Sequence, residues 1–194
     1  MLFTKNSFII KMKVVGSIIV RLGSKRLTYK NLLPFGDKPM LTLGIEKLRQ
    51  SKYVNEIVVS TESELLARVA YASGANILKR PPELAQDNIP SIPVFQHIFQ
   101  HYPCDVHVNF NINFPLCDYQ VIDKAIEIAL EKGESLSVPY AVWAQTSHCL
   151  LNYKDPWNIT AYQFPDPRSG TIDVHTEANL LEVHRMYQGN LPGW

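Results

Sequence analysis

Basic side chains are concentrated in residues 21–31, RLGSKRLTYKN, directly after an apolar run. The four cations are Arg21, Lys25, Arg26 and Lys30. Gly23 and Ser24 stand among them, and a glycine lets backbone N–H groups approach an anion that the cations neutralise. This composition is typical of a loop that holds a polyphosphate. A solvated basic connection that binds nothing has the same composition, so both interpretations stay open on the loop alone.

Two further polar residues stand close to the end of a predicted strand and the start of the next helix. Arg80 closes the short run NILKR, and Ser91 stands near the beginning of the following helix. A guanidinium at this place could reach the same ligand as residues 21–31, or it could point into water. Ser91 could donate a hydrogen bond to that ligand or simply cap its own helix.

Three asparagines alternate along the end of another predicted strand. Asn109, Asn111 and Asn113 are two positions apart, and side chains with that spacing in a strand share one face. Their amides would suit the edge of a base or a sugar. Ordinary structural hydrogen bonds are the alternative.

Two pairs of residues have spacings that could bind a metal ion. Asp173 lies in a predicted strand, 171–174, and His175 is two positions later on the same face, so the pair could hold one divalent cation. His97 and His101 are one helical turn apart, as in some zinc sites. Their helix also carries an apolar stripe and no third ligand is apparent, so we interpret this second pair as a surface or packing feature.

Apolar runs that predict strands alternate with amphipathic segments that predict helices. The predicted strands are 14–20, 55–61, 76–80, 105–112, 135–141, 159–164 and 171–174, and the predicted helices are 39–52, 62–75, 89–102, 114–133 and 176–189. Helices of ten or more residues between strands require right-handed crossovers and predict an α/β fold with a mostly parallel sheet. Because ligands bind at the carboxyl ends of such strands, the candidate residues should meet at one sheet edge.

The composition is that of one globular domain. The chain has 194 residues, 46% of them hydrophobic and 19% charged, which argues against disorder and against a membrane protein. A net charge of +1 provides no general field for nucleic acid or anionic lipid. Three cysteines without paired spacing indicate a reducing compartment, and we expect a cytoplasmic protein. We predict one domain over 14–194 after an extension, 1–13, in which Met12 is a candidate start and the apolar run is too short to span a membrane.

Five segments, in order, resemble motifs of the sugar-acid cytidylyltransferases, the acylneuraminate (CMP-sialic acid) synthetase group and its relatives for bacterial nonulosonic acids. One of them, from GDKPML to IVVSTESE, resembles a strand and a helix of that family. RLGSKRLTYKN resembles A-R-x-G-S-K-R-x-P-x-K-N, and KRPPELAQDNIPS resembles a segment with R-P-x-E-L-A-x-D. NFNINFPLCDYQ resembles the Q-P-T-S-P-L or Q-G-D-x-P-L turn, and GTIDVHTEANLLEV resembles a closing I-D-I-D-T-x-x-D-L. The match runs from about Val14 to Tyr187.

The resemblance implies a three-layer, Rossmann-like nucleotide-diphospho-sugar transferase fold and a reaction. The anomeric hydroxyl of a 2-keto sugar acid would attack the α-phosphorus of CTP, and pyrophosphate would leave with the help of Mg²⁺, or of Mn²⁺. The matching positions imply catalysis by Arg21, Lys25 and Lys30, nucleotide binding by Arg21, Leu22, Gly23, Ser24, Lys25, Asn31, Arg80 and Ser91, substrate binding by Asn111 and Asn113, and metal binding by Asp173 and His175. The partners would be CTP and a sugar acid, and the family also suggests a homodimer.

Several positions depart from the family pattern. Thr28 replaces the loop proline, and Asn113 replaces the Q-G-D aspartate of some members. His175 replaces the second carboxylate of I-D-I-D, and Asn179 replaces the later aspartate. Imidazole is a poor ligand for Mg²⁺. The stretch between 135–141 and 171–174 is also shorter than the region that covers the sugar site in the family. An alternative therefore stands beside the enzyme: a degenerate member that binds nucleotide or sugar and serves a binding or assembly role.

Overall fold

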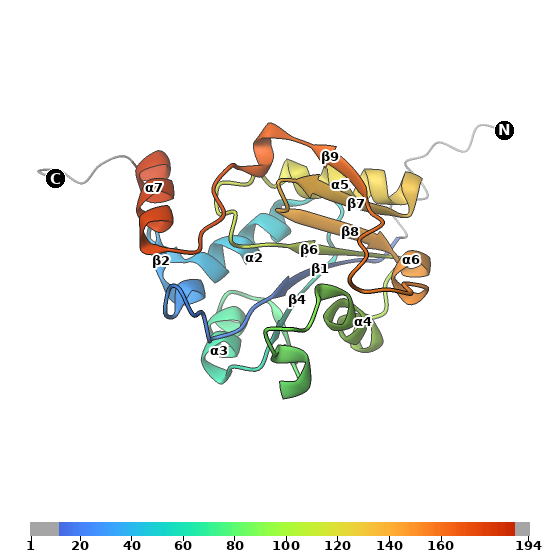
Figure 1. Ribbon diagram of the computed structural model, residues 1–194, viewed down its shortest axis with the longest axis horizontal. Helices are drawn as coiled ribbons and strands as arrows, with labels where there is room; N and C mark the ends of the chain where they lie inside the picture. Colours follow the sequence, from blue (N-terminus) through green and yellow to red (C-terminus); the bar gives the residue numbers. More distant parts are fainter. Residues whose placement is uncertain (1–11, 189–194) are drawn as a thin grey trace, which may run out of the picture.

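A seven-stranded sheet forms the centre of the computed structural model, which describes residues 12–188 (Figure 1). Nearly all of the predicted extension 1–13 lies outside the described residues. The strands are ordered β5-β4-β1-β6-β8-β7-β9 across the sheet. Their bounds are Val14–Ile19 (β1), Glu56–Thr61 (β4), Asn76–Lys79 (β5), Val106–Phe110 (β6), Glu134–Val138 (β7), Val142–Thr146 (β8) and Tyr162–Pro165 (β9).

Helices cover both faces of this sheet and give the predicted three layers. One face packs against α2 (Met40–Gln50), α3 (Glu64–Ala72) and α5 (Gln120–Lys132). The other face packs against α4 (Ser91–His101) and the short α6 (Ser147–Leu151). The apolar stripes of these helices are buried against β-branched strand residues, as expected for strands covered on both sides.

The sheet is mostly parallel, as predicted, with one reversed strand. β1 runs parallel to β4 and to β6, whereas β8 is antiparallel to both of its neighbours, β6 and β7. β8 is not among the predicted strands: the strand predicted at 135–141 ends just before it. In the structure β7 ends at Val138, and the Ser137 hydroxyl accepts the N–H groups of Ala141 and Val142 at 3.0 Å each. This side-chain bond holds the turn that begins β8.

Residues 171–174 do not form the predicted strand. The Val174 N–H donates to the Asn113 carbonyl at 2.9 Å, and the Val174 carbonyl accepts from Lys30 Nζ at 3.0 Å. The strand prediction is wrong because this backbone bonds to a turn and to a side chain, and no ladder partner lies beside it among the described residues. Val174 itself is fully buried.

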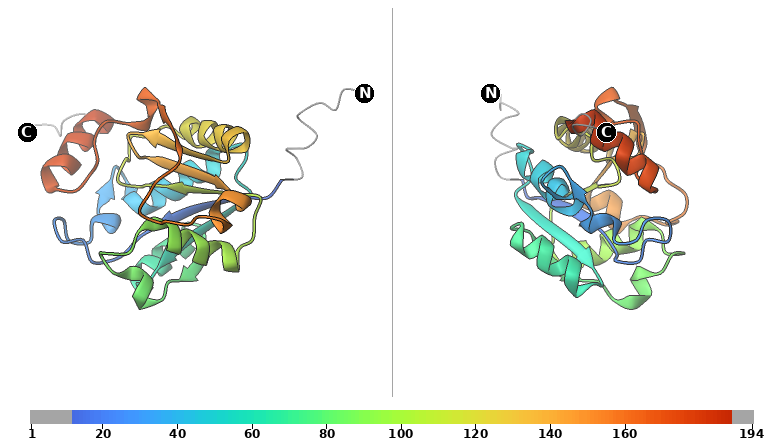
Figure 2. Two further views of the ribbon diagram at one scale, coloured as in Figure 1. Left: turned by 45° about the vertical axis from the view of Figure 1, so that its right-hand side comes forward. Right: turned by 90° about the vertical axis from the view of Figure 1, so that its left-hand side faces the viewer.

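The last helix closes one end of the molecule. α7 (Glu177–Gln188) packs on a small hairpin of β2 (Pro34–Phe35) and β3 (Lys38–Pro39), as both views of Figure 2 show. The rings of Phe35 and Tyr187 are 4.9 Å apart between centroids. This packing holds the segment before α7 beside residues 30–33, and so brings residues about 140 positions apart in the sequence to one site.

Candidate active site

A pocket of about 480 Å³ opens at the carboxyl ends of β1 and β6. Its lining comes from the loop after β1, from Asp87 and Ser91 before and at the start of α4, from the turn after β6, and from Tyr140 and His175. This is the sheet edge at which the sequence places its candidates. Parallel strands present their carboxyl ends together there, so residues distant in sequence share one cavity.

The basic loop is anchored at both ends by hydrogen bonds. The Leu22 N–H donates to Glu62 Oε1 at 2.9 Å, which fixes the loop just after β1. The Asn31 amide donates to the Arg21 carbonyl at 3.0 Å, which fixes its return. Tyr29 adopts a left-handed conformation with φ 54°, and a short 3-10 turn over Lys30–Leu32 follows. The loop therefore keeps a defined shape around the pocket.

Arg80 lies behind the loop and is only 5% exposed. Its guanidinium Nη2 donates to the Val20 carbonyl at 2.6 Å and to Glu62 Oε2 at 3.0 Å. Burial lowers the pKa of Arg80, while its bond to Glu62 raises it. The buried Arg80 and the partly buried Glu62 thus form a brace under the start of the loop. The predicted contact of Arg80 with the nucleotide stays a prediction, since Arg80 lines a smaller neighbouring hollow of about 220 Å³.

Lys30 lies at the base of the pocket, where its side chain is nearly buried. Its Nζ donates to Asn113 Oδ1 at 2.5 Å and to the Val174 carbonyl at 3.0 Å. Burial lowers the pKa of Lys30 to about 8, the Asp173 carboxylate raises it, and Arg26 and Arg21 lower it further. One ammonium group therefore ties the basic loop, the turn after β6 and the segment before α7 together.

Arg21 and Lys25 stand at the mouth of the pocket, where both pair with Asp87. Each oxygen of the Asp87 carboxylate takes one of the two cations. The hydrogen bond from Lys25, followed by that from Arg21, holds the pKa of Asp87 below its usual range. Ser91 lines the pocket nearby as the first residue of α4, and Gly23, Ser24 and Arg26 complete the basic wall.

The three asparagines all line the pocket but have different surroundings. Asn109 is inside β6 and donates to the Ser17 hydroxyl at 3.1 Å. β6 ends at Phe110, so Asn111 and Asn113 belong to a turn and do not continue the predicted alternation. The Asn111 amide donates to the Tyr140 carbonyl at 3.1 Å and its oxygen accepts the Asn113 N–H at 3.2 Å. Asn111 therefore shapes the turn, and Asn113 presents its side chain to Lys30.

Sequence reasoning does not single out Glu62, Asp87 or Tyr140. Glu62 follows β4 directly, so the rule that places ligands at strand ends could have found it. Asp87 belongs to the same R-P-x-E-L-A-x-D segment as Arg80. Tyr140 has no comparable signal: its hydroxyl donates to Asn109 Oδ1 at 3.3 Å, and burial raises the pKa of its phenol. It reaches the pocket only because β8 turns back beside β6.

The predicted metal pair is brought together, although not on a strand. His175 Nε2 and Asp173 Oδ2 are 2.9 Å apart, and His175 lines the pocket. Within residues 12–188, no group of three or more His, Cys, Asp or Glu side chains could hold a metal ion. One carboxylate fits a Mg²⁺ that takes most of its ligands from water and phosphate oxygens, which is how proteins commonly hold this ion. The ring centroids of His97 and His101 are 4.6 Å apart, also without a third ligand in that part of the chain.

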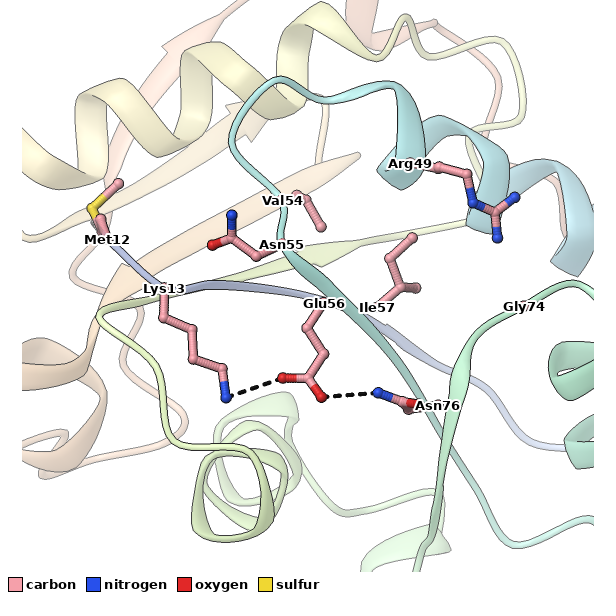
Figure 3. Close-up of a pocket in the computed structure, with 9 residues that line it drawn as sticks. All are labelled: Met12, Lys13, Arg49, Val54, Asn55, Glu56, Ile57, Gly74 and Asn76. Atoms are coloured by element: carbon pink, nitrogen blue, oxygen red, sulfur yellow. Dashed lines mark hydrogen bonds and ion pairs between the residues drawn. The ribbon is translucent and has the colours of Figure 1, made fainter. Parts of the chain in front are cut away.

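A larger hollow, of about 740 Å³, lies at the opposite, amino end of β1, β4 and β5 (Figure 3). Its charged groups satisfy one another: Lys13 Nζ is 3.0 Å from Glu56 Oε2, and the Asn76 amide donates to Glu56 Oε1 at 2.9 Å. This hollow is larger than the basic pocket, but among the described residues its paired polar groups leave no set of free donors for one ligand. Over residues 12–188, the structure contains no helix with the length and apolar character needed to cross a membrane.

Known proteins share sequence and fold with this chain. Residues 16–163, more than half of the chain, match the family model described as cytidylyltransferase. The N-acylneuraminate cytidylyltransferase of Escherichia coli is 39% identical over 90 residues, which cover 46% of this chain and 22% of that protein. The CMP-N,N'-diacetyllegionaminic acid synthase of Legionella pneumophila is 31% identical over 144 residues, which cover 71% of this chain and 62% of that protein. The matches thus span less than two thirds of either relative.

The fold is shared with a solved structure of CMP:2-keto-3-deoxy-manno-octonic acid synthetase in complex with CTP. The two superpose with a TM-score of 0.76 over 92% of this chain and 100% of that one, at 16% sequence identity. The three-layer nucleotidyltransferase fold is thereby confirmed. Together with the family match over residues 16–163, this shows that the chain belongs to the cytidylyltransferase family.

Proposed function

We propose that this chain transfers a cytidylyl group from CTP to a 2-keto sugar acid of the sialic or nonulosonic type and releases pyrophosphate. The observation that carries the proposal is the basic pocket, in which four cations of residues 21–31 surround a cavity at the carboxyl ends of β1 and β6. Both substrates are anionic, and a cavity lined by cations lowers the free energy of holding them together.

The triphosphate would lie along the basic loop. Arg21 and Lys25 at the mouth, with Arg26 beside them, would neutralise the outer phosphates. Gly23 carries no side chain, and no atom lies within 4 Å of the place where a Cβ would stand, so an anion can approach the backbone there. The brace of Glu62 and Arg80 would keep this loop in place before the nucleotide arrives.

Lys30 would act on the reacting phosphate. An ammonium group has three N–H donors, and two of them are used by Asn113 and Val174. The third can reach into the pocket, toward an oxygen of the α-phosphate or of the leaving pyrophosphate. Transfer of a phosphoryl-type group depends mainly on position and on neutralising charge that develops in the transition state, and a fixed, nearly buried cation provides both.

The sugar acid would lie toward the turn after β6. Asn113 accepts from Lys30 through Oδ1, and within residues 12–188 its Nδ2 group has no protein acceptor, so it can donate to a hydroxyl or carboxylate. Tyr140 and His175 line the same part of the cavity. Mg²⁺ bound to the triphosphate would be held by Asp173, with water completing its shell, and would supply neutralising charge to the leaving group.

A second candidate function is nucleotide or sugar binding without turnover. The observation in its favour is the metal side of the pocket, where His175 pairs with Asp173 and no group of three or more His, Cys, Asp or Glu side chains forms among the described residues. Weak metal binding would slow the departure of pyrophosphate more than it would weaken the binding of CTP.

Thermal unfolding with CTP, UTP, ATP or GTP, each with Mg²⁺ or Mn²⁺, separates the two candidates when it is followed by a pyrophosphate-release assay. We expect CTP to raise the midpoint temperature of unfolding more than the other three nucleotides do. Pyrophosphate release should require a sialic-type or 3-deoxy-octulosonate-type acid. Stabilisation by CTP without release on any acid would favour the binding protein. Lys25→Ala should abolish the CTP shift, and an unchanged shift in that variant would show that the loop does not hold the triphosphate.

A further inference from the structure

Asp87 holds two of the four cations of the basic loop, Arg21 and Lys25. Oδ1 contacts Arg21 Nη1 and Oδ2 contacts Lys25 Nζ. The carboxylate itself lines the pocket, and it also lines the smaller hollow on the other side of residues 86–91. It therefore lies between the loop and α4, at the mouth through which a ligand must pass.

A carboxylate in this position has the same contacts that a phosphate would make. It offers two anionic oxygens to one guanidinium and one ammonium, and both cations belong to the loop assigned to the triphosphate. Asp87 occupies one side of each cation, and its negative charge repels a phosphate that approaches the same two groups. A phosphate therefore binds Arg21 and Lys25 most strongly when it replaces Asp87.

The exchange is physically easy because all three side chains are exposed. The exposed fractions are 40% for Arg21, 81% for Lys25 and 44% for Asp87. Ion pairs between exposed side chains are weak and are screened by salt. In the pair of Arg80 with Glu62, by contrast, the arginine side chain is only 5% exposed.

We propose that Asp87 is an exchangeable counter-ion of the triphosphate site, which occupies Arg21 and Lys25 when no nucleotide is bound and is displaced when the polyphosphate enters. The proposal rests on the proposed function, since it takes the basic loop as the phosphate site. It assigns Asp87 an autoinhibitory contact: the carboxylate lowers the affinity for CTP and competes with pyrophosphate for the same two cations after transfer.

Titration calorimetry of the full chain with inorganic tripolyphosphate, and with CTP in the presence of Mg²⁺, tests this directly. Asp87→Asn keeps the size of the side chain and removes its charge, and we expect it to tighten tripolyphosphate binding by about 3- to 10-fold at 0.05 M salt, from the usual strength of two exposed ion pairs. The gain should shrink in 0.5 M salt, where screening shortens the range of the charges. Asp87→Glu retains the charge and should restore most of the wild-type affinity.

Glu83→Gln is the matched control, because Glu83 is an exposed carboxylate of the same segment that does not line either cavity. Glu83→Gln should leave the affinity for tripolyphosphate unchanged, because the effect comes from the pairing of Asp87 with Arg21 and Lys25 and not from the general charge of the segment. A structural defect cannot raise affinity, so a gain confined to Asp87→Asn supports the proposal.

Unchanged or weaker binding of tripolyphosphate by a folded Asp87→Asn variant would overturn the proposal while leaving the proposed function intact. An equal gain in Glu83→Gln would overturn it as well. If the wild-type chain binds neither tripolyphosphate nor CTP, the proposed function fails first, and the counter-ion role fails with it.

Discussion

Lys30 should make the binding of CTP depend on pH between 7 and 9. Its pKa is lowered to about 8, mainly by burial, and its Nζ is held by Asn113 and Val174. A bound triphosphate adds negative charge beside this ammonium and should raise its pKa toward the ordinary value. Because the pKa is higher in the complex than in the free chain, the affinity is fully present below about pH 8 and falls as the pH rises through that value.

The size of the effect follows from the two protonation states. If only the protonated form binds well, the affinity scales with the protonated fraction of Lys30 in the free chain. For a pKa of about 8, that fraction falls roughly 10-fold between pH 7 and pH 9, which corresponds to about 1.4 kcal/mol of binding free energy. Burial lowers the pKa of His107 to about 3 and raises those of Cys104 and Cys117 to about 12, so these three groups do not titrate in this range.

Titration calorimetry with CTP at pH 7, 8 and 9, at constant ionic strength and saturating Mg²⁺, measures how the affinity for CTP changes with pH. Lys30→Met keeps the length of the side chain without the charge, so its affinity should be lower and should vary much less with pH. A wild-type affinity that stayed constant from pH 7 to 9, or a Lys30→Met variant that kept the wild-type pH dependence, would exclude Lys30 as the group that titrates.

The brace and the metal pair give further predictions. Glu62→Gln weakens the bond to the nearly buried Arg80 and the acceptor for the Leu22 N–H. We expect the free energy of unfolding in urea to fall by about 1–3 kcal/mol. The KM for CTP should rise several-fold, with a smaller change in kcat. A larger loss of kcat than of CTP affinity would show that Glu62 acts on the chemistry. His175→Asp places a second carboxylate 2 positions from Asp173, and the Mg²⁺ concentration for half-maximal pyrophosphate release should fall; an unchanged concentration would exclude Asp173 as the metal ligand.

The parallel part of the fold could be predicted from sequence, because buried parallel strands carry a strong signal. β1 and β4 are β-branched runs between amphipathic helices, and such runs have few alternatives to a covered strand. β8 carries no such signal. Its residues, VWAQT, include the polar Gln145, which is buried because it donates to the Glu134 carboxylate on β7. Only the paired strand explains why a polar side chain can be there.

Within the site, too, the cations carry a sequence signal, and the carboxylates that hold them do not. A cluster of like charges, such as residues 21–31, stands out in sequence because it must repel itself unless something neutralises it. The carboxylates that do so are single residues in other segments: Glu62 under the loop, beside Arg80, and Asp87 across its mouth. Their pairing is a property of the folded sheet edge, which brings the ends of β4 and β5 beside that of β1. Glu62 pairs with a buried arginine and fixes the loop, whereas Asp87 pairs with two exposed cations and can exchange. The burial of the cation, which sequence does not give, therefore decides which acidic residue shapes the phosphate site and which one competes for it.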